Sequence, residues 1–238
     1  MKTLALITAI AATGHDDDLA PLLQACADAG IHARVVAWDD TTVSWSRYDA
    51  ALLRSPWDYT ERLPEFLAWC ERVAATTVLH NPLHVIRWNT DKHYLGDLAA
   101  MDVPVVPTQF VEADAEPLEA LQAFLAAYSA EELVVKPAVS AGARDTQRYA
   151  RSQEFAASNH IARLLDAGRS VMLQPYLRAV DSRGETALIY FDGQFSHAIR
   201  KGALLQADTP STPLPYANGH ITAREADLKE RALAEQAL

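Results

Sequence analysis

The stretch TLALITAIAATGHDDDLAPLLQACADAGIHARVVAW, residues 3–38, decides the fold of the first part of the chain. Apolar runs at 3–8 and 31–38 predict two strands, and apolar residues recur at helical spacing between 19 and 29. The acidic residues at 16–18 favour a helix start there, because carboxylates are stabilised at the positive end of a helix dipole. Strand, helix and strand in this order predict a parallel β–α–β unit.

The same alternation continues to about residue 80, with strands expected at 48–53 and 77–79 and a helix at 63–73. Parallel sheets bind ligands beyond the carboxyl ends of their strands. The loops at 9–18 and 54–60 (RSPWDYT) are therefore candidate substrate contacts, with Arg54 at the end of its strand. Gly14 stands alone after the first strand, which argues against a dinucleotide fingerprint.

Around Asn81-Pro82 the pattern changes to α+β with antiparallel strands. Helices are expected at 90–100 (capped by Thr90), 118–128 and 155–165, strands at 133–136, 146–150 and 171–173, and an extended stretch at 105–111. Residues 185–202 predict a hairpin around Asp192-Gly193, a pair suited to a type I′ turn. A proline-rich loop at 208–219 precedes a final helix at 222–238, expected to lack a cap and a partner. The domain boundary is expected near residues 81–90.

Composition excludes several classes of protein. With 50% hydrophobic residues the chain is too apolar to be disordered, and its net charge of −10 argues against binding nucleic acid or anionic membranes. Two cysteines, Cys26 and Cys70, fit neither a disulfide scaffold nor a zinc pair and indicate a reducing cytoplasm. The stretch 3–12 also fits a weak secretory signal, but a single preceding lysine and the β–α–β pattern favour a strand. We therefore expect a soluble, cytoplasmic protein.

The familiar catalytic strings GxxxxGK[ST], HExxH and GxSxG are absent. His15 beside three acidic residues suggests a metal site, but a helix start explains the acids better. His80 and His84 have no third ligand nearby in the sequence and are interpreted as structural. No metal site is predicted within these residues.

The cations are more informative. Lys136 ends an apolar strand before Pro137 and a small-residue loop, a setting that suits a nucleotide phosphate because backbone N–H groups can approach it closely. The alternative is a lysine that extends to solvent from a strand end. Arg144 and Arg148 follow the loop, and Arg200-Lys201 close the hairpin opposite Glu185. Their convergence indicates an anionic ligand, and ordinary surface ion pairing is the alternative.

Five strings carry a resemblance to a known family: RSPWDY (54–59), NTDKHYL (89–95), VVKPAVSAGARDT (134–146), QPYL (174–177) and GETALIYFDGQFSHAIRKG (184–202). In this order they resemble the ATP-grasp ligases of the glutathione-synthetase-like branch, and within it the O-ureido-serine cyclo-ligases of cycloserine biosynthesis. The resemblance runs over nearly the whole chain. It implies an N-terminal parallel-sheet (pre-ATP-grasp) substrate domain at 1–88. An α+β ATP-grasp domain at 89–238 would follow, without its C-terminal strands.

The resemblance also implies roles for individual residues. Lys92 and Lys136 match the two lysines that hold ATP phosphates. The resemblance adds three groups of cofactor-binding positions. Ser140, Ala141 and Gly142 match a loop that covers the phosphates, and Gln174, Pro175, Tyr176 and Leu177 match the adenine hinge. Asp181 and Glu185 match acids near the ribose or phosphates. Arg200, assisted by Lys201, matches the basic position at the transferring phosphoryl group. Arg54 matches a position that faces the acceptor substrate.

The expected reaction follows from this resemblance. ATP phosphorylates a carboxylate of a small amino-acid-like substrate, and a nitrogen nucleophile displaces the phosphate, in the same molecule for a cyclo-ligase. Magnesium is implied as well, but its carboxylate ligands would lie on strands beyond Leu238, so the chain is expected to be a fragment or a degenerate relative. A homodimer is expected by analogy, with no nucleic-acid or membrane partner. The alternatives are a non-catalytic nucleotide-binding module and, more remotely, a sugar- or nucleotide-modifying enzyme without ATP.

Overall fold

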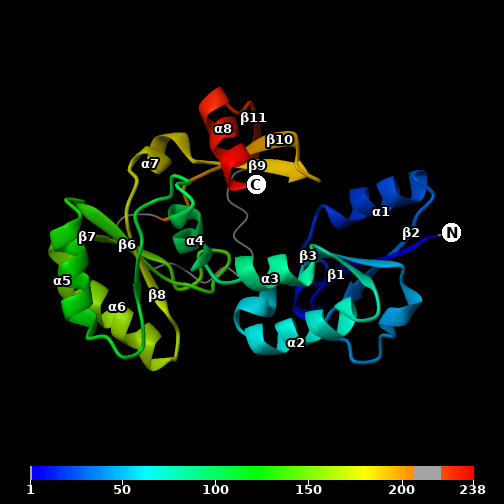
Figure 1. Cartoon of the computed structure of the whole chain (residues 1–238), viewed down its shortest axis with the longest axis horizontal. Coiled ribbons are helices and arrows are strands. Elements are labelled where there is room, and N and C mark those ends of the chain that lie inside the picture. The colour runs from blue at the N-terminus through cyan, green and yellow to red at the C-terminus, as the bar shows by residue number, and fades with distance from the viewer. Residues whose placement is uncertain (1, 206–220) are drawn as a thin grey trace. The chain divides into compact units, whose positions relative to one another are not determined.

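The computed structural model of the chain describes residues 2–205 and 221–238 (Figure 1). The predicted loop at 208–219 lies outside these residues. Tertiary contacts divide the chain into two compact units, Met1–Asp91 and Lys92–Leu238. No helix among the described residues is long and apolar enough to cross a membrane.

The first unit contains the predicted parallel sheet. Its strands, in the spatial order β2-β1-β3-β4, are β1 (Thr3–Thr8), β2 (His32–Ala37), β3 (Ala50–Ser55) and β4 (Val78–His80). The helices are α1 (Leu19–Asp28), α2 (Leu63–Ala74) and α3 (Leu83–Asn89), with short 3-10 turns at Ile10–Ala12, Trp45–Arg47 and Trp57–Thr60. The centre of β1 is fully buried, as the inner strand of a parallel sheet requires. Both cysteines are buried and free.

The second unit contains two antiparallel sheets. The first has the order β5-β8-β6-β7, formed by β5 (Gln109–Val111), β6 (Glu132–Pro137), β7 (Gln147–Ala150) and β8 (Val171–Pro175). The second has the order β11-β10-β9, formed by β9 (Glu185–Phe191), β10 (Gln194–Lys201) and β11 (Ile221–Arg224). The helices are α4 (Tyr94–Ala100), α5 (Pro117–Ala127), α6 (Glu154–Asp166), α7 (Ala179–Arg183) and α8 (Leu228–Ala237), with a 3-10 turn at Arg151–Gln153.

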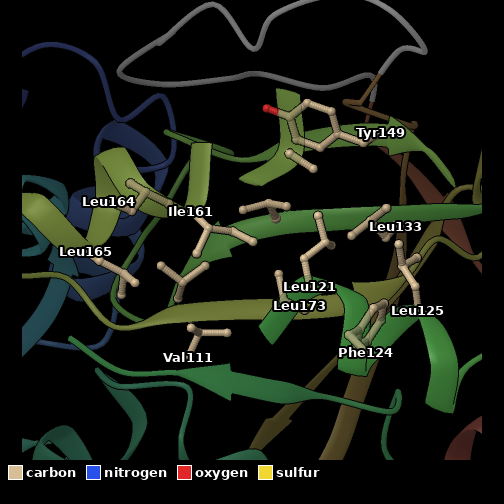
Figure 2. Close-up of a cluster of buried hydrophobic side chains, with 13 residues drawn as sticks. Val111, Leu121, Phe124, Leu125, Leu133, Tyr149, Ile161, Leu164, Leu165 and Leu173 are labelled. Carbon is tan, nitrogen blue, oxygen red and sulfur yellow. The ribbon is translucent and has the colours of Figure 1, made fainter. Parts of the chain in front are cut away.

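Helices α5 and α6 cover one face of the first of these sheets. Side chains from both helices meet alternate strand residues in one buried cluster (Figure 2), which includes Phe124, Ile161, Leu133, Val135 and Leu173. Because successive side chains of a strand point to opposite faces, the residues between them face away from the helices. The opposite face of β6, β7 and β8 is therefore the one that can build a site.

The structure confirms most predicted elements, including the hairpin. Asp192 and Gly193 both have positive φ, 51° and 72°, as a type I′ turn requires. The extended stretch at 105–111 becomes a strand only from Gln109 onward.

Two predicted helices were wrong in extent. The helix expected at 90–100 begins at Tyr94. Thr90 is instead the C-terminal cap of α3, a helix that was not predicted from the sequence. The one expected at 222–238 begins at Leu228, because Asp227 accepts hydrogen bonds from the N–H groups of Lys229 and Glu230 and caps it. The residues before this cap form β11, which pairs with β10. The final helix therefore has both a cap and a partner, since Thr186 of β9 donates to Glu230 at 2.7 Å.

Candidate active site

The face of the sheet opposite α5 and α6 lines a cavity of about 740 Å³. Val134 and Lys136 of β6 and Gln174 of β8 point to it, in the alternation that sends Leu133, Val135 and Leu173 into the core. The remaining lining comes from the turn before α4, the loop after β6, the segment after β8, α7, and the open end of the β9–β10 hairpin. Three lysines and one glutamate are its charged lining residues among the described part of the chain: Lys92, Lys136, Lys201 and Glu185.

Lys136 is a partly buried cation of this cavity. Desolvation lowers the pKa of its ammonium, and the negative charge of Glu185 opposes this shift. Within the described residues the ammonium group of Lys136 makes no hydrogen bond or ion pair. A partly buried cation of this kind would be stabilised by an anionic ligand.

The loop after β6 offers further donors. Gly142 and Ala143 both have left-handed backbones, with φ of 61° and 57°, which curls the loop tightly. The N–H groups of residues 140–143 donate no hydrogen bond within the described part of the chain. Free N–H groups in a curled loop are a suitable cradle for phosphate oxygens.

Lys92 supports this loop from the side. Its ammonium donates to Ser140 O at 2.8 Å, Ser140 Oγ at 3.1 Å and Ala138 O at 3.2 Å, and its own N–H donates to Ala138 O. Lys92 can adopt this position because it lies in the turn before α4 rather than inside a helix. The two predicted phosphate lysines therefore differ, since Lys92 is bound to the loop whereas Lys136 has no such contact.

The predicted hinge forms the opposite end of the cavity. Gln174, Pro175, Tyr176 and Leu177 all line it, and so does Val180 of α7. Gln174 is fixed because its side chain donates to Thr108 at 2.8 Å. Burial raises the pKa of Tyr176 to about 12, and its hydrogen bond to Asp181 adds to this shift.

The two basic residues at the open end of the β9–β10 hairpin, Arg200 and Lys201, point to opposite faces of the sheet. Lys201 pairs with Glu185 across the strands, and both line the cavity. Arg200 projects to the other face and donates to Ser182 O at 2.7 Å, so it is not among the lining residues. Arg200 also packs on Gly184, where a β-carbon would lie 2.3 Å from Lys201 O.

Three other predicted residues have protein partners. Asp181 accepts hydrogen bonds from Arg148 and Tyr176 and does not line the cavity. Arg148 is paired with Glu132 and Asp181, so it is occupied by ion pairs as the alternative expected, but its side chain is buried rather than on the surface. In the first unit, Arg54 at the end of β3 donates to Asp16 at 3.1 Å and to Asp18 at 3.4 Å.

Sequence reasoning missed several lining residues, mostly apolar: Tyr94, Val106, Val134, Ala143, Thr146, Val180, Leu204 and Leu205. Strand alternation around Lys136 could have found Val134, and the neighbourhood of Lys92 could have found Tyr94. Leu204 and Leu205 follow the hairpin with no periodic signal. No group of three His, Cys, Asp or Glu side chains that could hold a metal ion occurs in the described ranges 2–205 and 221–238.

Comparison with known proteins gives the family. Residues 4–81 match the family described as the N-terminal domain of D-cycloserine synthetase DcsG. The cycloserine biosynthesis protein DcsG of Streptomyces lavendulae is 49% identical over 241 residues, covering 100% of this chain and 79% of that protein. The crystal structure of D-cycloserine synthetase DcsG matches with a TM-score of 0.92 and 48% identity, over 99% of this chain and 79% of that one. A RimK domain ATP-grasp protein from Sphaerobacter thermophilus shares the fold, with a TM-score of 0.67 and 17% identity, over 99% of this chain and 80% of that one.

A parallel-sheet unit, followed by two antiparallel sheets whose residues surround one cavity, is the fold that this chain shares with the ATP-grasp class. Within that class, the chain belongs to the family of ATP-grasp ligases that includes DcsG. It is therefore an enzyme of the ATP-dependent ligase class, whose members form carbon–nitrogen bonds.

Proposed function

We propose that this enzyme uses ATP to activate the carboxylate of an amino acid of the O-ureido-serine type and closes it to cycloserine. The observation that carries the proposal is that one cavity holds a partly buried Lys136 ammonium and a loop of backbone N–H groups, none of which has a hydrogen-bond partner among the described residues. The identity of 49% to the cycloserine biosynthesis protein supports the choice of product.

The cavity suggests how ATP would lie. The apolar hinge end, with Val134, Leu177 and Val180, suits the base, and Lys136 and the loop suit the triphosphate. Pro175 has no N–H and the Tyr176 N–H donates to Glu132 O, whereas the Leu177 N–H has no hydrogen-bond partner in the described part of the chain. We assign this N–H to the edge of the adenine ring.

The chemistry then needs two displacements. A carboxylate oxygen of the substrate attacks the γ-phosphorus, the bond to the β-phosphate oxygen breaks, and ADP leaves an acyl phosphate behind. A nitrogen of the same molecule attacks the acyl carbon, and phosphate departs as the carbon–nitrogen bond forms. With an O-ureido substrate, water must also remove the carbamoyl group as carbon dioxide and ammonia for the atoms to balance.

The protein supplies positioning and charge for these steps. Lys136 and the N–H groups of the loop neutralise the phosphoryl oxygens, and Lys201 adds positive charge beside Glu185. The loop at 140–143, when closed over the phosphates, would keep water from the acyl phosphate. Arg54 is proposed to act toward the substrate, whereas Arg200, which donates to Ser182 O outside the cavity lining, is assigned no contact with the transferring phosphoryl group.

Magnesium is the expected companion of ATP in this class, and when bound it would neutralise negative charge on the phosphates. The described residues do not fit a complete magnesium site, since Glu185 is the single carboxylate among the lining residues they contribute. No step is assigned to the metal. A cytoplasmic location is proposed, because ATP is required.

The direct test is turnover. Incubation with magnesium, ATP and O-ureido-serine should release ADP, phosphate, ammonia and cycloserine in equal amounts, measured by coupled assay and mass spectrometry. Cycloserine without ATP consumption, or no product from any O-ureido amino acid, would contradict the proposal. ATP binding without product would favour the non-catalytic nucleotide-binding alternative.

A further inference from the structure

The hinge end of the cavity rests on one buried guanidinium that does not line it. Arg148, on β7, is 9% exposed. Its Nε and Nη2 donate to the two carboxylate oxygens of Glu132, each at 2.8 Å. Its Nη1 donates to both carboxylate oxygens of Asp181, at 3.0 and 3.1 Å. One side chain thus connects β6, β7 and α7.

Tyr176 of the hinge is held by the same group of residues. Its N–H donates to Glu132 O at 2.9 Å, and its hydroxyl donates to Asp181. The Arg148 Cζ lies 3.7 Å from the centroid of its ring, in cation–π contact. The backbone, ring and hydroxyl of Tyr176 are therefore each fixed by Arg148 or by a partner of Arg148.

The geometry excludes a direct role for Arg148 toward phosphate. All three of its nitrogens donate to protein carboxylates, and the cavity is lined by Tyr176 and Val180 instead. These contacts also require an arginine. A lysine ammonium cannot form two parallel hydrogen bonds to one carboxylate while it also binds a second carboxylate and stacks on an aromatic ring.

We propose that Arg148 is a positioning residue that fixes the wall against which the nucleotide base binds, and so sets affinity for the base without touching it. The inference rests on the proposed use of the cavity for ATP. It assigns Asp181 to the same task, as an anchor of α7 and Tyr176 rather than a ligand of the ribose.

The test compares a ligand that has a base with one that lacks it. Calorimetric titrations with magnesium-ATP and with magnesium tripolyphosphate are made on the wild type and on Arg148→Lys. We expect Arg148→Lys to bind ATP about tenfold more weakly, while its affinity for tripolyphosphate changes by less than about twofold. A purely structural defect would weaken both ligands together, so the ratio of the two affinities is the decisive quantity.

Arg151→Lys is the matched control. Arg151 donates to the carbonyls of Leu125, Tyr128 and Ala130 at the end of α5, so this variant also loses arginine hydrogen bonds and should leave the ratio unchanged. Should Arg148→Lys fail to fold, Asp181→Asn takes its place, with a ratio shift in the same direction of about threefold.

The outcomes separate the two proposals. A wild type that binds no ATP overturns the proposed function. A wild type that binds ATP, with a folded Arg148→Lys or Asp181→Asn whose affinity ratio is unchanged, overturns the role of Arg148 alone.

Discussion

The two ends of the cavity differ in how their charged groups are satisfied. At the hinge end, Arg148 donates from all its nitrogens to carboxylates, and the protein itself completes the network. At the loop end, Lys136 and four backbone N–H groups have no hydrogen-bond partner among the described residues. The hinge end is thus preorganised by the fold, whereas the groups of the loop end remain available to an anionic ligand.

The largest expected effect comes from removing the unsatisfied charge. Lys136→Met should weaken ATP binding about 100-fold, or about 2.7 kcal/mol, because a charge-assisted contact to phosphate is lost. Its melting temperature should not fall, since a desolvated cation without a hydrogen bond costs the folded state free energy.

Lys229→Met is the control for Lys136→Met, because Lys229 is an exposed residue of α8 outside the cavity lining. Calorimetry and thermal unfolding measure both variants. Unchanged ATP affinity in Lys136→Met, or a lower melting temperature, would show that this end of the cavity is structural like the hinge end.

A second variant disturbs the junction between the two ends. Gly184 joins α7 to β9 with φ 69° and ψ −164°, a conformation that is almost confined to glycine. In Gly184→Ala the new β-carbon would meet Lys201 O at 2.3 Å, so we expect a loss of about 2–3 kcal/mol in the free energy of unfolding.

Gly193→Ala provides the comparison for the junction variant. Gly193 also has positive φ, 72°, but a β-carbon there would have no atom within 4 Å. It should cost about 1 kcal/mol, from backbone strain alone. Urea unfolding measures both variants. Equal losses in the free energy of unfolding would mean that the contact between the new β-carbon at position 184 and Lys201 O does not destabilise the fold.

The loop end was easier to predict from sequence than the hinge end. Lys136, Pro137 and the small residues 140–143 are contiguous, so local composition was sufficient to suggest a phosphate site. Arg148 lies 16 positions from Glu132 and 33 from Asp181 along the chain, and the pairing of β6 with both β7 and β8 is needed to bring the three together. The strings of the hinge were recognised, but the supporting role of these residues was not.

The parallel sheet was predicted because each of its elements carries its own periodicity. The errors at Thr90 and at 222–227 have a different cause. Thr90 fits an N-terminal helix cap by residue type, but the residues before it, Leu83–Asn89, form α3, and Thr90 is the C-terminal cap of that helix. Thr222 and Ala223 were predicted as part of the final helix, although pairing with β10 places them in a strand.

A third prediction uses pH to distinguish the loop end of the cavity, where Lys136 lies, from the hinge end. Burial lowers the pKa of the Lys136 ammonium below its ordinary value of 10.5. Between the lowered pKa and 10.5, the unfolded chain still holds a proton that the folded chain has lost. In that window Lys136 makes the free energy of unfolding rise with pH, while ATP affinity falls as the ammonium loses its proton. ATP is fully ionised above about pH 8, so a titration upward from there follows the protein.

Lys136→Arg is the control for the pH series, because a guanidinium stays protonated throughout. Its ATP affinity should be flat over the same range. If wild type and Lys136→Arg lose affinity in parallel, another group is responsible for the pH dependence.

The smallest effect is expected at the outer edge of the hinge end, in Arg178→Ala. Arg178 also donates to Glu132, at 3.1 Å, and it pairs with Glu131, but its side chain is 62% exposed, against 9% for Arg148. Water screens such a pair and replaces its hydrogen bonds, whereas water cannot replace those of a buried guanidinium. ATP affinity should therefore stay within about twofold of the wild type, by the same calorimetric titration. A loss as large as that of Arg148→Lys would mean that the charge around Glu132, rather than the fixed geometry behind Tyr176, holds the hinge in place.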